Sequence, residues 1–184
     1  MGFDLTGLNP NLVRPEPELP PFPERTNEDW GLYHEWQEEN CGTYFRNNVW
    51  GWRPLWNFVT GACDDILTEK DMEAGCYNDG HKISKTKADR IAKRLWKLIN
   101  SDQVKEYEEE YKAGLASLEQ LDCDICDATG KRQEPPSIGA GDMECNGCKG
   151  TGKKDDWAKS YPFSEDNVRQ FANFCANSGG FRIC

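Results

Sequence analysis

The sequence predicts an α+β fold, mainly α, from three observations. Residues 84–99 place apolar side chains at helical spacing, with lysines and arginines on the opposite side. Residues 2–5 and 181–184 alternate apolar and polar side chains, a pattern typical of strands. Two CxxC pairs, at 123–126 and 145–148, have the spacing of a four-thiolate metal site. We therefore expect a helical domain with a short pairing of its N- and C-terminal strands and an inserted zinc knuckle.

The first half of the chain has local signals for an extended segment and three helices. Residues 10–26 are rich in proline, which removes backbone donors and favours extended backbone. Asn27, followed by two acidic residues, predicts the start of a helix. Pro54 suits the first turn of a short helix, and Thr68 can cap another. The helix at Pro54 is expected to bury Leu55, Trp56, Phe58 and Val59.

The second half of the chain has signals for three more helices. In residues 84–99, the apolar face consists of Ala88, Ile91, Ala92, Leu95, Leu98 and Ile99. Residues 104–118 form an acidic helical stretch that is expected to lie antiparallel to the basic helix. Ser164 can cap a last helix, which Gly179 and Gly180 end. Solvated faces explain both charge runs without a binding role.

These elements divide the chain into two expected parts. A length of 184 residues is enough for one ordinary domain and a small appendage. We expect the main helical domain to comprise residues 1–118 and 160–184. Residues 119–159 would then form the zinc knuckle between its two segments.

Charge and hydropathy exclude two classes of protein. The formal net charge is −10, whereas a general nucleic-acid binder needs a basic surface to neutralise phosphates; local basic patches remain compatible with this charge. No run approaches the about 18 apolar residues of a membrane span, and the first residues lack the pattern of a signal peptide. We therefore expect a cytoplasmic protein with no membrane partner and no general nucleic-acid binding.

Four of the nine cysteines, Cys123, Cys126, Cys145 and Cys148, are predicted to bind one structural zinc ion. A tight turn after the first cysteine of each pair frees backbone donors toward the thiolates. Four sulfur ligands leave no position for a catalytic water. A dithiol redox centre is the alternative, but two pairs flanked by glycines favour a metal. The other five, expected to be reduced thiols, are Cys41, Cys63, Cys76, Cys175 and Cys184.

Residues 44–56 are the densest run of aromatic and guanidinium groups in the chain. Such groups can stack on a flat ring and hold phosphate, which suits a nucleotide-like ligand. The alternative is that the tryptophans belong to the core and the arginines pair with acidic side chains. A predicted turn at residues 78–80 adds further polar candidates. The candidate ligand-binding residues are Arg46, Asn47, Asn48, Trp50, Trp52, Arg53, Trp56, Asn78, Asp79 and His81.

The two CxxC segments resemble the CxxCxGxG knuckle of the DnaJ cysteine-rich region. The second, residues 145–152, matches this pattern, and the first, residues 123–130, departs from it only at Ala128. DnaJ proteins have four such half-sites and two zinc ions, so two half-sites imply one ion here. The chain has no His-Pro-Asp tripeptide of a J-domain, and a co-chaperone role therefore does not follow from the resemblance.

Over most of its length the chain resembles a family of uncharacterised tailed-bacteriophage proteins. The segments that carry this resemblance are residues 2–5, 44–56, 65–68, 77–81, the CxxC pairs, and 160–164 through 178–184. The resemblance implies the cytoplasm of an infected bacterium as the setting and supplies no established activity. By analogy, small phage proteins of this kind often act against host defences, by binding a defence protein or by sequestering a nucleotide signal.

These observations support three functional hypotheses. The first is a non-enzymatic binding protein that sequesters a nucleotide-derived signal, with the tryptophans stacking the base, Arg46 and Arg53 holding phosphate, and a homo-oligomer enclosing the ligand if one chain cannot. The second is a protein–protein interaction module that inhibits or adapts a host or phage protein, such as a host defence protein, through its acidic surface or the knuckle lysines. The third is a nucleotide hydrolase using Asp79 and His81.

Overall fold

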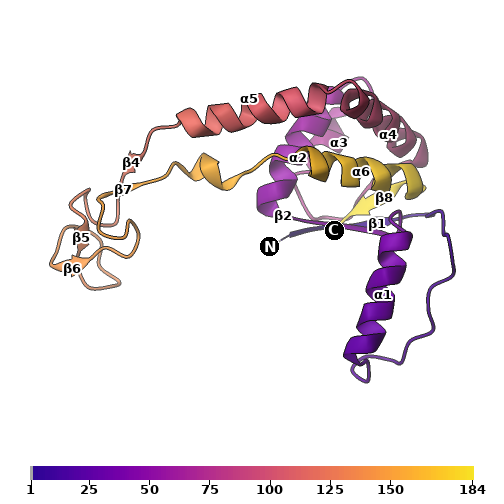
Figure 1. Cartoon of the computed structure of the whole chain (residues 1–184), viewed down its shortest axis with the longest axis horizontal. Helices are drawn as coiled ribbons and strands as arrows, with labels where there is room; N and C mark the ends of the chain where they lie inside the picture. The colour runs from indigo at the N-terminus through magenta and orange to yellow at the C-terminus, as the bar shows by residue number, and fades with distance from the viewer. Residues whose placement is uncertain (1) are drawn as a thin grey trace. The chain divides into compact units, whose positions relative to one another are not determined.

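The computed structural model describes residues 2–184, which divide into two compact units (Figure 1). The first unit runs to Glu109 and resumes at Phe163, and the second comprises Glu110–Pro162. The second unit is wider than the predicted knuckle, residues 119–159, because it includes the end of a helix on one side and a short 3-10 helix on the other. The architecture is α+β and mainly α, as predicted.

A four-stranded antiparallel sheet forms the base of the first unit. Its strands are β1 (Gly2–Gly7), β2 (Tyr44–Asn48), β3 (His81–Ile83) and β8 (Phe181–Ile183), in the order β2-β1-β8-β3. The predicted pairing of the two termini is confirmed, since β1 and β8 are neighbours with Leu5 opposite Ile183. Asp4 and Cys184 extend this pairing through two backbone hydrogen bonds of 2.8 and 2.9 Å. β2 and β3 were not predicted, because each is short and its residues were assigned to a ligand site or a turn.

The sheet buries one face against helices. Side chains alternate between the two faces of a strand, so every second residue of β1 and β8 is buried. Helices α2 (Val49–Ala62), α4 (Lys85–Asn100) and α6 (Glu165–Asn177) lie on the same side of the sheet (Figure 1). The buried sheet residues are Phe3, Leu5, Phe45, Ile83, Phe181 and Ile183.

Helices α4 and α6 pack against each other. The predicted apolar face of α4 is buried except for Leu98, which is half-buried. The predicted face of α6 is buried in full, from Val168 to Cys175. Each large apolar side chain buried in this way contributes about 1.5–3 kcal/mol. The 3.6-residue pattern therefore identified the main helical contact of the unit.

Helix α2 starts earlier than predicted. It begins at Val49, where the Asn48 side chain accepts a hydrogen bond of 2.8 Å from the Gly51 amide. Pro54 lies inside the helix instead of at its first turn. A proline removes one backbone donor, but the asparagine cap and burial of Trp52, Leu55 and Val59 keep the segment helical.

Two helices carry capping boxes. In α1 (Asn27–Glu39) the cap is Thr26, one residue before the predicted Asn27, because the Thr26 hydroxyl and the Asp29 carboxylate bond each other's backbone amides. In α3 (Glu69–Ala74) Thr68 and Asp71 form the same arrangement, and Gly75 ends the helix as predicted.

The proline-rich segment has no helix or strand and lies on α1. The Trp36 indole N–H donates to the Arg14 carbonyl at 3.1 Å, and the Val13 amide donates to the Asn40 side chain at 2.7 Å. The Arg25 guanidinium lies over the Trp30 ring, 5.0 Å from its centroid. These contacts attach the two ends of the segment, residues 13–14 and residue 25, to α1 and its C-cap.

Helix α5 (Gln103–Ser117) does not pair with the basic helix. The sequence predicted an antiparallel acidic partner for α4, but the helix in extensive contact with α4 is α6, and α5 makes no comparable contact. Only a two-residue turn separates α4 from α5. Burial of the apolar faces of α4 and α6 against each other stabilises the unit more than ion pairs between two solvent-exposed helices would. The basic face of α4 is therefore not covered by α5.

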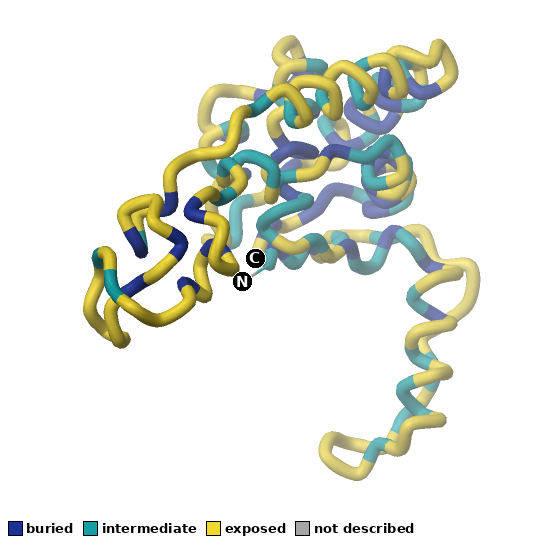
Figure 2. The backbone as a smooth tube through the Cα atoms, turned by 60° about the vertical axis from the view of Figure 1, so that its left-hand side comes forward, coloured by how far each residue is buried: buried dark blue, intermediate teal, exposed yellow. Residues whose placement is uncertain are grey.

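The second unit contains two short hairpin-like pairings and one 3-10 helix. β4 (Leu121–Asp122) pairs with β7 (Lys153–Lys154), and β5 (Lys131–Arg132) pairs with β6 (Met143–Glu144). η1 (Trp157–Ser160) follows β7. Buried positions in this unit are few and are separated by exposed backbone (Figure 2).

A buried carboxylate, Asp71, joins α3, β3 and α4. Its oxygens accept hydrogen bonds from the Thr68 cap, from His81 at 2.9 Å and from the Lys87 ammonium. Burial opposes its ionisation, but the hydrogen bonds from Lys87, Thr68 and His81 outweigh burial and hold the pKa of this carboxyl well below its usual 3.8. The ionised form of Asp71 is thus part of the folded state.

None of the helices in residues 2–184 has the length and apolar character that crossing a membrane requires.

Because the pKa of Asp71 is depressed in the folded state, its contribution to stability is present above pH 3.8 and is lost as the pH falls toward the folded-state pKa. Asp71→Asn should lower the free energy of unfolding at pH 7 by about 2 kcal/mol and flatten the loss of stability below pH 4. Urea denaturation from pH 2 to pH 7 measures both. Asp89→Asn, which removes an exposed pair with Lys85, is the matched control and should change stability by less than about 0.5 kcal/mol; equal effects of the two variants would contradict the account.

Candidate metal centre and ligand cavities

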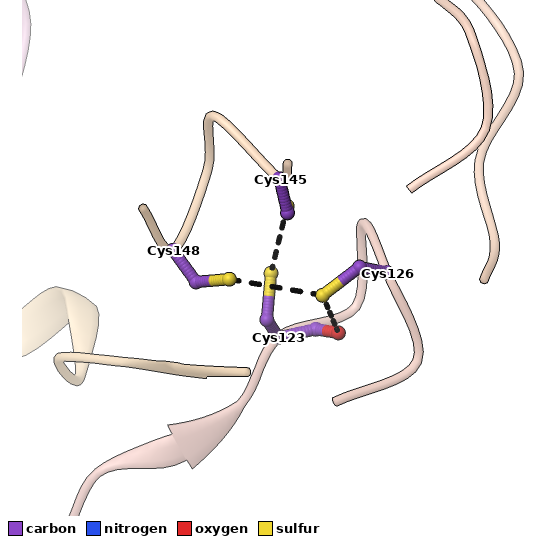
Figure 3. A group of neighbouring side chains, drawn as sticks. All are labelled: Cys123, Cys126, Cys145 and Cys148. Carbon is purple, nitrogen blue, oxygen red and sulfur yellow. Dashed lines mark hydrogen bonds between the residues drawn. The ribbon is translucent and has the colours of Figure 1, made fainter. Parts of the chain in front are cut away.

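Cys123, Cys126, Cys145 and Cys148 converge on one point in the second unit (Figure 3). All four are buried, and their sulfur atoms lie within 4.8 Å of one another. Cys123 and Cys126 come from the turn after β4, and Cys145 and Cys148 from the turn after β6. This cluster could hold a metal ion.

Two of the sulfur separations match those of tetrahedral coordination. Four sulfurs about 2.3 Å from a central ion are separated from each other by about 3.8 Å in a regular tetrahedron. The Cys123 and Cys145 sulfurs are 3.8 Å apart, and the Cys126 and Cys148 sulfurs are 3.7 Å apart. These close pairs join the two halves of the site instead of linking the two cysteines of one CxxC pair. The arrangement favours the metal over the dithiol alternative.

The two half-sites have the same backbone construction. The Cys123 amide donates to the Gly152 carbonyl and the Cys145 amide to the Gly130 carbonyl, both at 2.9 Å. In each half a threonine hydroxyl donates to the carbonyl of the second cysteine, from Thr129 at 2.6 Å and from Thr151 at 2.7 Å. The repeat explains why the sequence similarity of the halves extends beyond the cysteines.

Gly130 and Gly152 are required where the halves meet. A Cβ on Gly130 would lie 2.2 Å from the Gly150 carbonyl oxygen, and one on Gly152 would lie 2.2 Å from the Ala128 carbonyl oxygen. Both glycines also have φ of +76°. Side chains at these positions would separate the two half-sites.

Ala128 and Gly150 occupy equivalent positions, and both have left-handed backbone. The φ angle is +62° at Ala128 and +78° at Gly150. An alanine in this region is strained by contact of its Cβ with the carbonyl oxygen. The one departure from the glycine pattern in the first half-site is therefore a point of local strain.

The thiols of the cluster differ in acidity before a metal binds. Burial raises the pKa of Cys126 to about 12. Burial acts in the same direction on Cys148, but hydrogen bonds, among them one of 3.2 Å from the Gly152 amide, outweigh it and lower the pKa to about 7. A bound cation would favour the thiolate form of every ligand, so metal binding should release protons.

Arg132 is a structural residue that the sequence did not suggest. It is 9% exposed, and its guanidinium donates to the Asn146 side chain at 2.8 Å and to the Ser137 carbonyl at 3.0 Å. These bonds tie the linker between the half-sites to the second CxxC turn. A basic residue between two cysteine pairs has no sequence pattern that predicts such a role.

The remaining cysteines are free thiols in the described chain. Cys63 and Cys175 are buried, Cys41 is half-buried, and Cys76 and Cys184 are exposed. Burial raises the pKa of Cys63 to about 11 and that of Cys175 well above its usual value. The two buried thiols therefore act as small apolar groups of the core.

Trp52 and Trp56 are core residues, so the prediction that they stack on a ligand is corrected. Trp52 is 0% exposed and Trp56 2%. The Trp52 ring stacks on Phe3 and on Trp56, with centroids 5.2 Å apart in both pairs. Their indole N–H groups donate to the carbonyls of Gly75 at 2.8 Å and Met72 at 2.9 Å. Both rings are therefore buried by packing against the sheet and α3, as core side chains are.

Arg53 lies beside a cavity of about 260 Å³ at one side of α2. The cavity reaches the buried tryptophans, and its exposed wall contains Asn57, Cys76 and Tyr77. Tyr77 is 58% exposed, so its ring remains accessible. Sequence reasoning missed Asn57, Cys76 and Tyr77, although Tyr77 directly precedes the candidate turn. Trp50 is half-buried in the first turn of α2 and does not line this cavity.

Three other candidates in the aromatic segment lie elsewhere. Arg46 pairs with Asp4 at 3.6 Å and lines a separate cavity of about 420 Å³. Asn47 donates to the Asn167 side chain at 2.7 Å, and Asn48 caps α2. Arg46 is in β2 and Arg53 is in α2, and the two arginines line different cavities.

The candidates around the predicted turn have structural partners. The Asn78 amide donates to the Gly2 carbonyl at 2.7 Å, and Asp79 is exposed. His81 bonds Asp71, 2.9 Å away, instead of forming the hydrolase pair proposed with Asp79. Because His81 is opposite Ile183 in the sheet, its side chain is on the core side, where the buried carboxylate of α3 lies.

The equivalent positions 128 and 150 provide a matched pair of substitutions. Ala128→Gly should raise the free energy of unfolding of the metal-loaded protein by about 1 kcal/mol, because it relieves left-handed strain. Gly150→Ala should lower the free energy by a similar amount for the same reason. Guanidinium denaturation of both proteins measures the difference, and effects of the same sign would contradict the assignment.

No protein-family model, no curated protein and no solved structure matches this chain. The features of the chain that bear on its function are the buried cysteine cluster and the cavity beside Arg53.

Proposed function

We propose that the chain binds one structural zinc ion through Cys123, Cys126, Cys145 and Cys148. The observation that supports this assignment is the close fit of the sulfur separations, 3.7 and 3.8 Å, to a tetrahedral zinc–thiolate site. Soft thiolate ligands in a tetrahedral set favour zinc over oxygen-seeking ions such as magnesium or calcium. With four protein ligands the shell is closed, so the ion stabilises the fold and does not activate water.

Elemental analysis of the purified protein should give about one zinc per chain. Cys145→Ser should reduce the zinc content and lower stability by several kcal/mol, because metal binding is part of the folding energy of such units. Cys76→Ser, at an exposed thiol outside the cluster, is the control and should change neither value. Zinc affinity should fall at acidic pH, because protons compete for the thiolates. A metal-free protein of unchanged stability would overturn the assignment.

We further propose that the protein is a non-enzymatic binding protein for a nucleotide-derived ligand, in the setting of a phage-infected bacterium. The supporting observation is the cavity at which Arg53, Asn57 and Tyr77 converge. Tyr77 offers an aromatic face, Arg53 a guanidinium for phosphate, and Asn57 an amide for a base edge. The sequence assigned stacking of the base to Trp50, Trp52 or Trp56, and phosphate binding to Arg46 and Arg53.

The size of the cavity limits the part of the ligand that can enter it. Pockets for drug-sized ligands measure about 300–1,000 Å³, whereas this cavity measures about 260 Å³. One ring and one phosphate fit better than a whole dinucleotide. A larger signal molecule would extend out of the cavity, where a second copy of the chain could cover it.

Titration calorimetry against cyclic dinucleotides and cyclic ADP-ribose isomers tests this proposal. We expect binding of at least one ligand, weakened about tenfold by Arg53→Ala, because a charge-assisted hydrogen bond contributes about 1.5–3 kcal/mol. Tyr77→Ala should weaken binding as well. Arg46→Ala is the matched control, since Arg46 lines a different cavity, and should leave affinity unchanged. Absence of heat with every ligand would refute the proposal.

A second candidate is docking on a host or phage protein through the second unit. Ile138 and Met143 are 69% and 51% exposed, so both side chains are accessible to a partner. Of the knuckle lysines, Lys153 pairs with Asp122 and Lys154 with Asp124, both at 2.5 Å. Purification from infected cells distinguishes the candidates: a stoichiometric protein partner favours docking, and a co-purifying nucleotide favours ligand binding.

A further inference from the structure

Helix α4 concentrates positive charge in a strongly acidic chain. It carries six basic side chains and one acidic side chain, Asp89, whereas the whole chain has a formal charge of −10. The basic residues are Lys85, Lys87, Arg90, Lys93, Arg94 and Lys97. Lys93 and Lys97 of this face are exposed on the surface of the first unit.

Four of these six side chains have a carboxylate partner. Lys85 pairs with Asp89, and Lys87 bonds the buried Asp71. Arg90 and Arg94 share the single carboxylate of Asp65, at 3.5 and 2.9 Å. This shared pairing still leaves one excess positive charge beside Asp65.

Lys93 and Lys97 form the unneutralised centre of the face. Both are exposed, and within residues 2–184 neither has an ion-pair partner. They are four residues apart, so they lie on one side of α4, about one turn apart. Two grooves flank them and share both lysines, one of about 480 Å³ and one of about 240 Å³.

The larger groove also contains an aromatic ring. Trp96 is half-buried and lines this groove together with Asn100 and the two lysines. The Arg169 guanidinium lies over the indole, 5.5 Å from the ring centroid, and Arg169 is in turn paired with Glu165. These contacts fix the orientation of the ring at the wall of the groove. The smaller groove adds Arg90 and Arg94 on the other side of the lysines.

We propose that this face of α4 binds single-stranded nucleic acid. A base would lie against Trp96 in the larger groove, and consecutive phosphates would lie along Lys93 and Lys97 toward Arg90 and Arg94. Aromatic rings combined with a basic groove are the general means of holding single strands without reading their sequence. Asn100 and Asp89 offer an amide and a carboxylate to base edges in the same groove.

The aromatic ring favours nucleic acid over an acidic protein segment. Both partners would satisfy the lysines, but an acidic peptide gains little from a flat ring beside them, whereas every base has a face that stacks. The proposal is also compatible with the net charge of the chain. The negative charge elsewhere repels a polyanion, so binding should be confined to this face and weakened by salt.

Fluorescence anisotropy with labelled oligodeoxythymidine and oligoribouridine of about ten nucleotides, within the usual site size of one module, tests the proposal. We expect binding at low salt that is tighter than that of thymidine monophosphate or polyglutamate. Lys93→Gln/Lys97→Gln should lower affinity about tenfold and reduce the slope of log K against log salt by about 1.4, or about 0.7 per lost phosphate contact. Trp96→Leu should weaken binding, and Trp96→Phe should restore most of it.

Two controls separate this face from net charge and from the cavity at Arg53. Lys70→Gln/Lys105→Gln removes the same charge from exposed positions outside the grooves and should leave affinity nearly unchanged. Arg53→Ala should leave oligonucleotide binding intact, so this proposal and the proposed function can fail separately. Equal binding of polyglutamate or of thymidine monophosphate, no binding of either oligonucleotide, or equal effects of the two double variants would each overturn the proposal.

Discussion

The convergence of four cysteine sulfurs on one point is the constraint on which the second unit depends. In residues 110–162 the buried side chains are the four cysteines and Arg132, and Ile125 is the one partly buried apolar side chain packed on them. So small a set of apolar groups cannot offset the loss of conformational entropy on folding. A metal ion bonded to all four sulfurs would supply the missing free energy, and the paired turns, the glycines and Arg132 place the four sulfurs close together.

The first unit is organised differently, by burial of apolar side chains. β1 pairs with β2 and with the last strand, β8, so both ends of the chain belong to one sheet. Helices α2, α4 and α6 cover the sheet with aromatic and aliphatic side chains, and Asp71 joins three elements at its edge. Because β8 follows the second unit in sequence and pairs with β1 and β3, the chain leaves the first unit after Glu109 and returns to it at Phe163. The first unit thus relies on burial of apolar side chains, whereas we propose that the second relies on coordination of a metal ion.

The sequence predicted local features of this structure better than it predicted which residues would be in contact across the fold. The apolar faces of α4 and α6, the Thr68 cap and the terminal strands follow from spacing and alternation, and the four cysteines follow from their own chemistry. The positions of the aromatic segment's side chains depend on contacts that residue spacing does not predict. Trp52 stacks on Phe3, the Trp56 indole donates to the Met72 carbonyl, and Asn47 donates to Asn167. Asp71 could not be chosen over Asp79 as the partner of His81 without knowing that β3 lies beside α3. Arg53 does line a cavity, and Tyr77 is the exposed aromatic residue beside it.

The central claim is that the second unit is folded around a closed four-sulfur metal site. X-ray absorption spectroscopy of the purified protein at the zinc edge tests it most directly, because it reports the kind, number and distance of the ligands. The account predicts four sulfur ligands at about 2.3 Å and no nitrogen or oxygen ligand. A mixed shell that includes oxygen or nitrogen, or fewer than four sulfurs, would contradict a closed structural site and would reopen the question of chemistry at the metal.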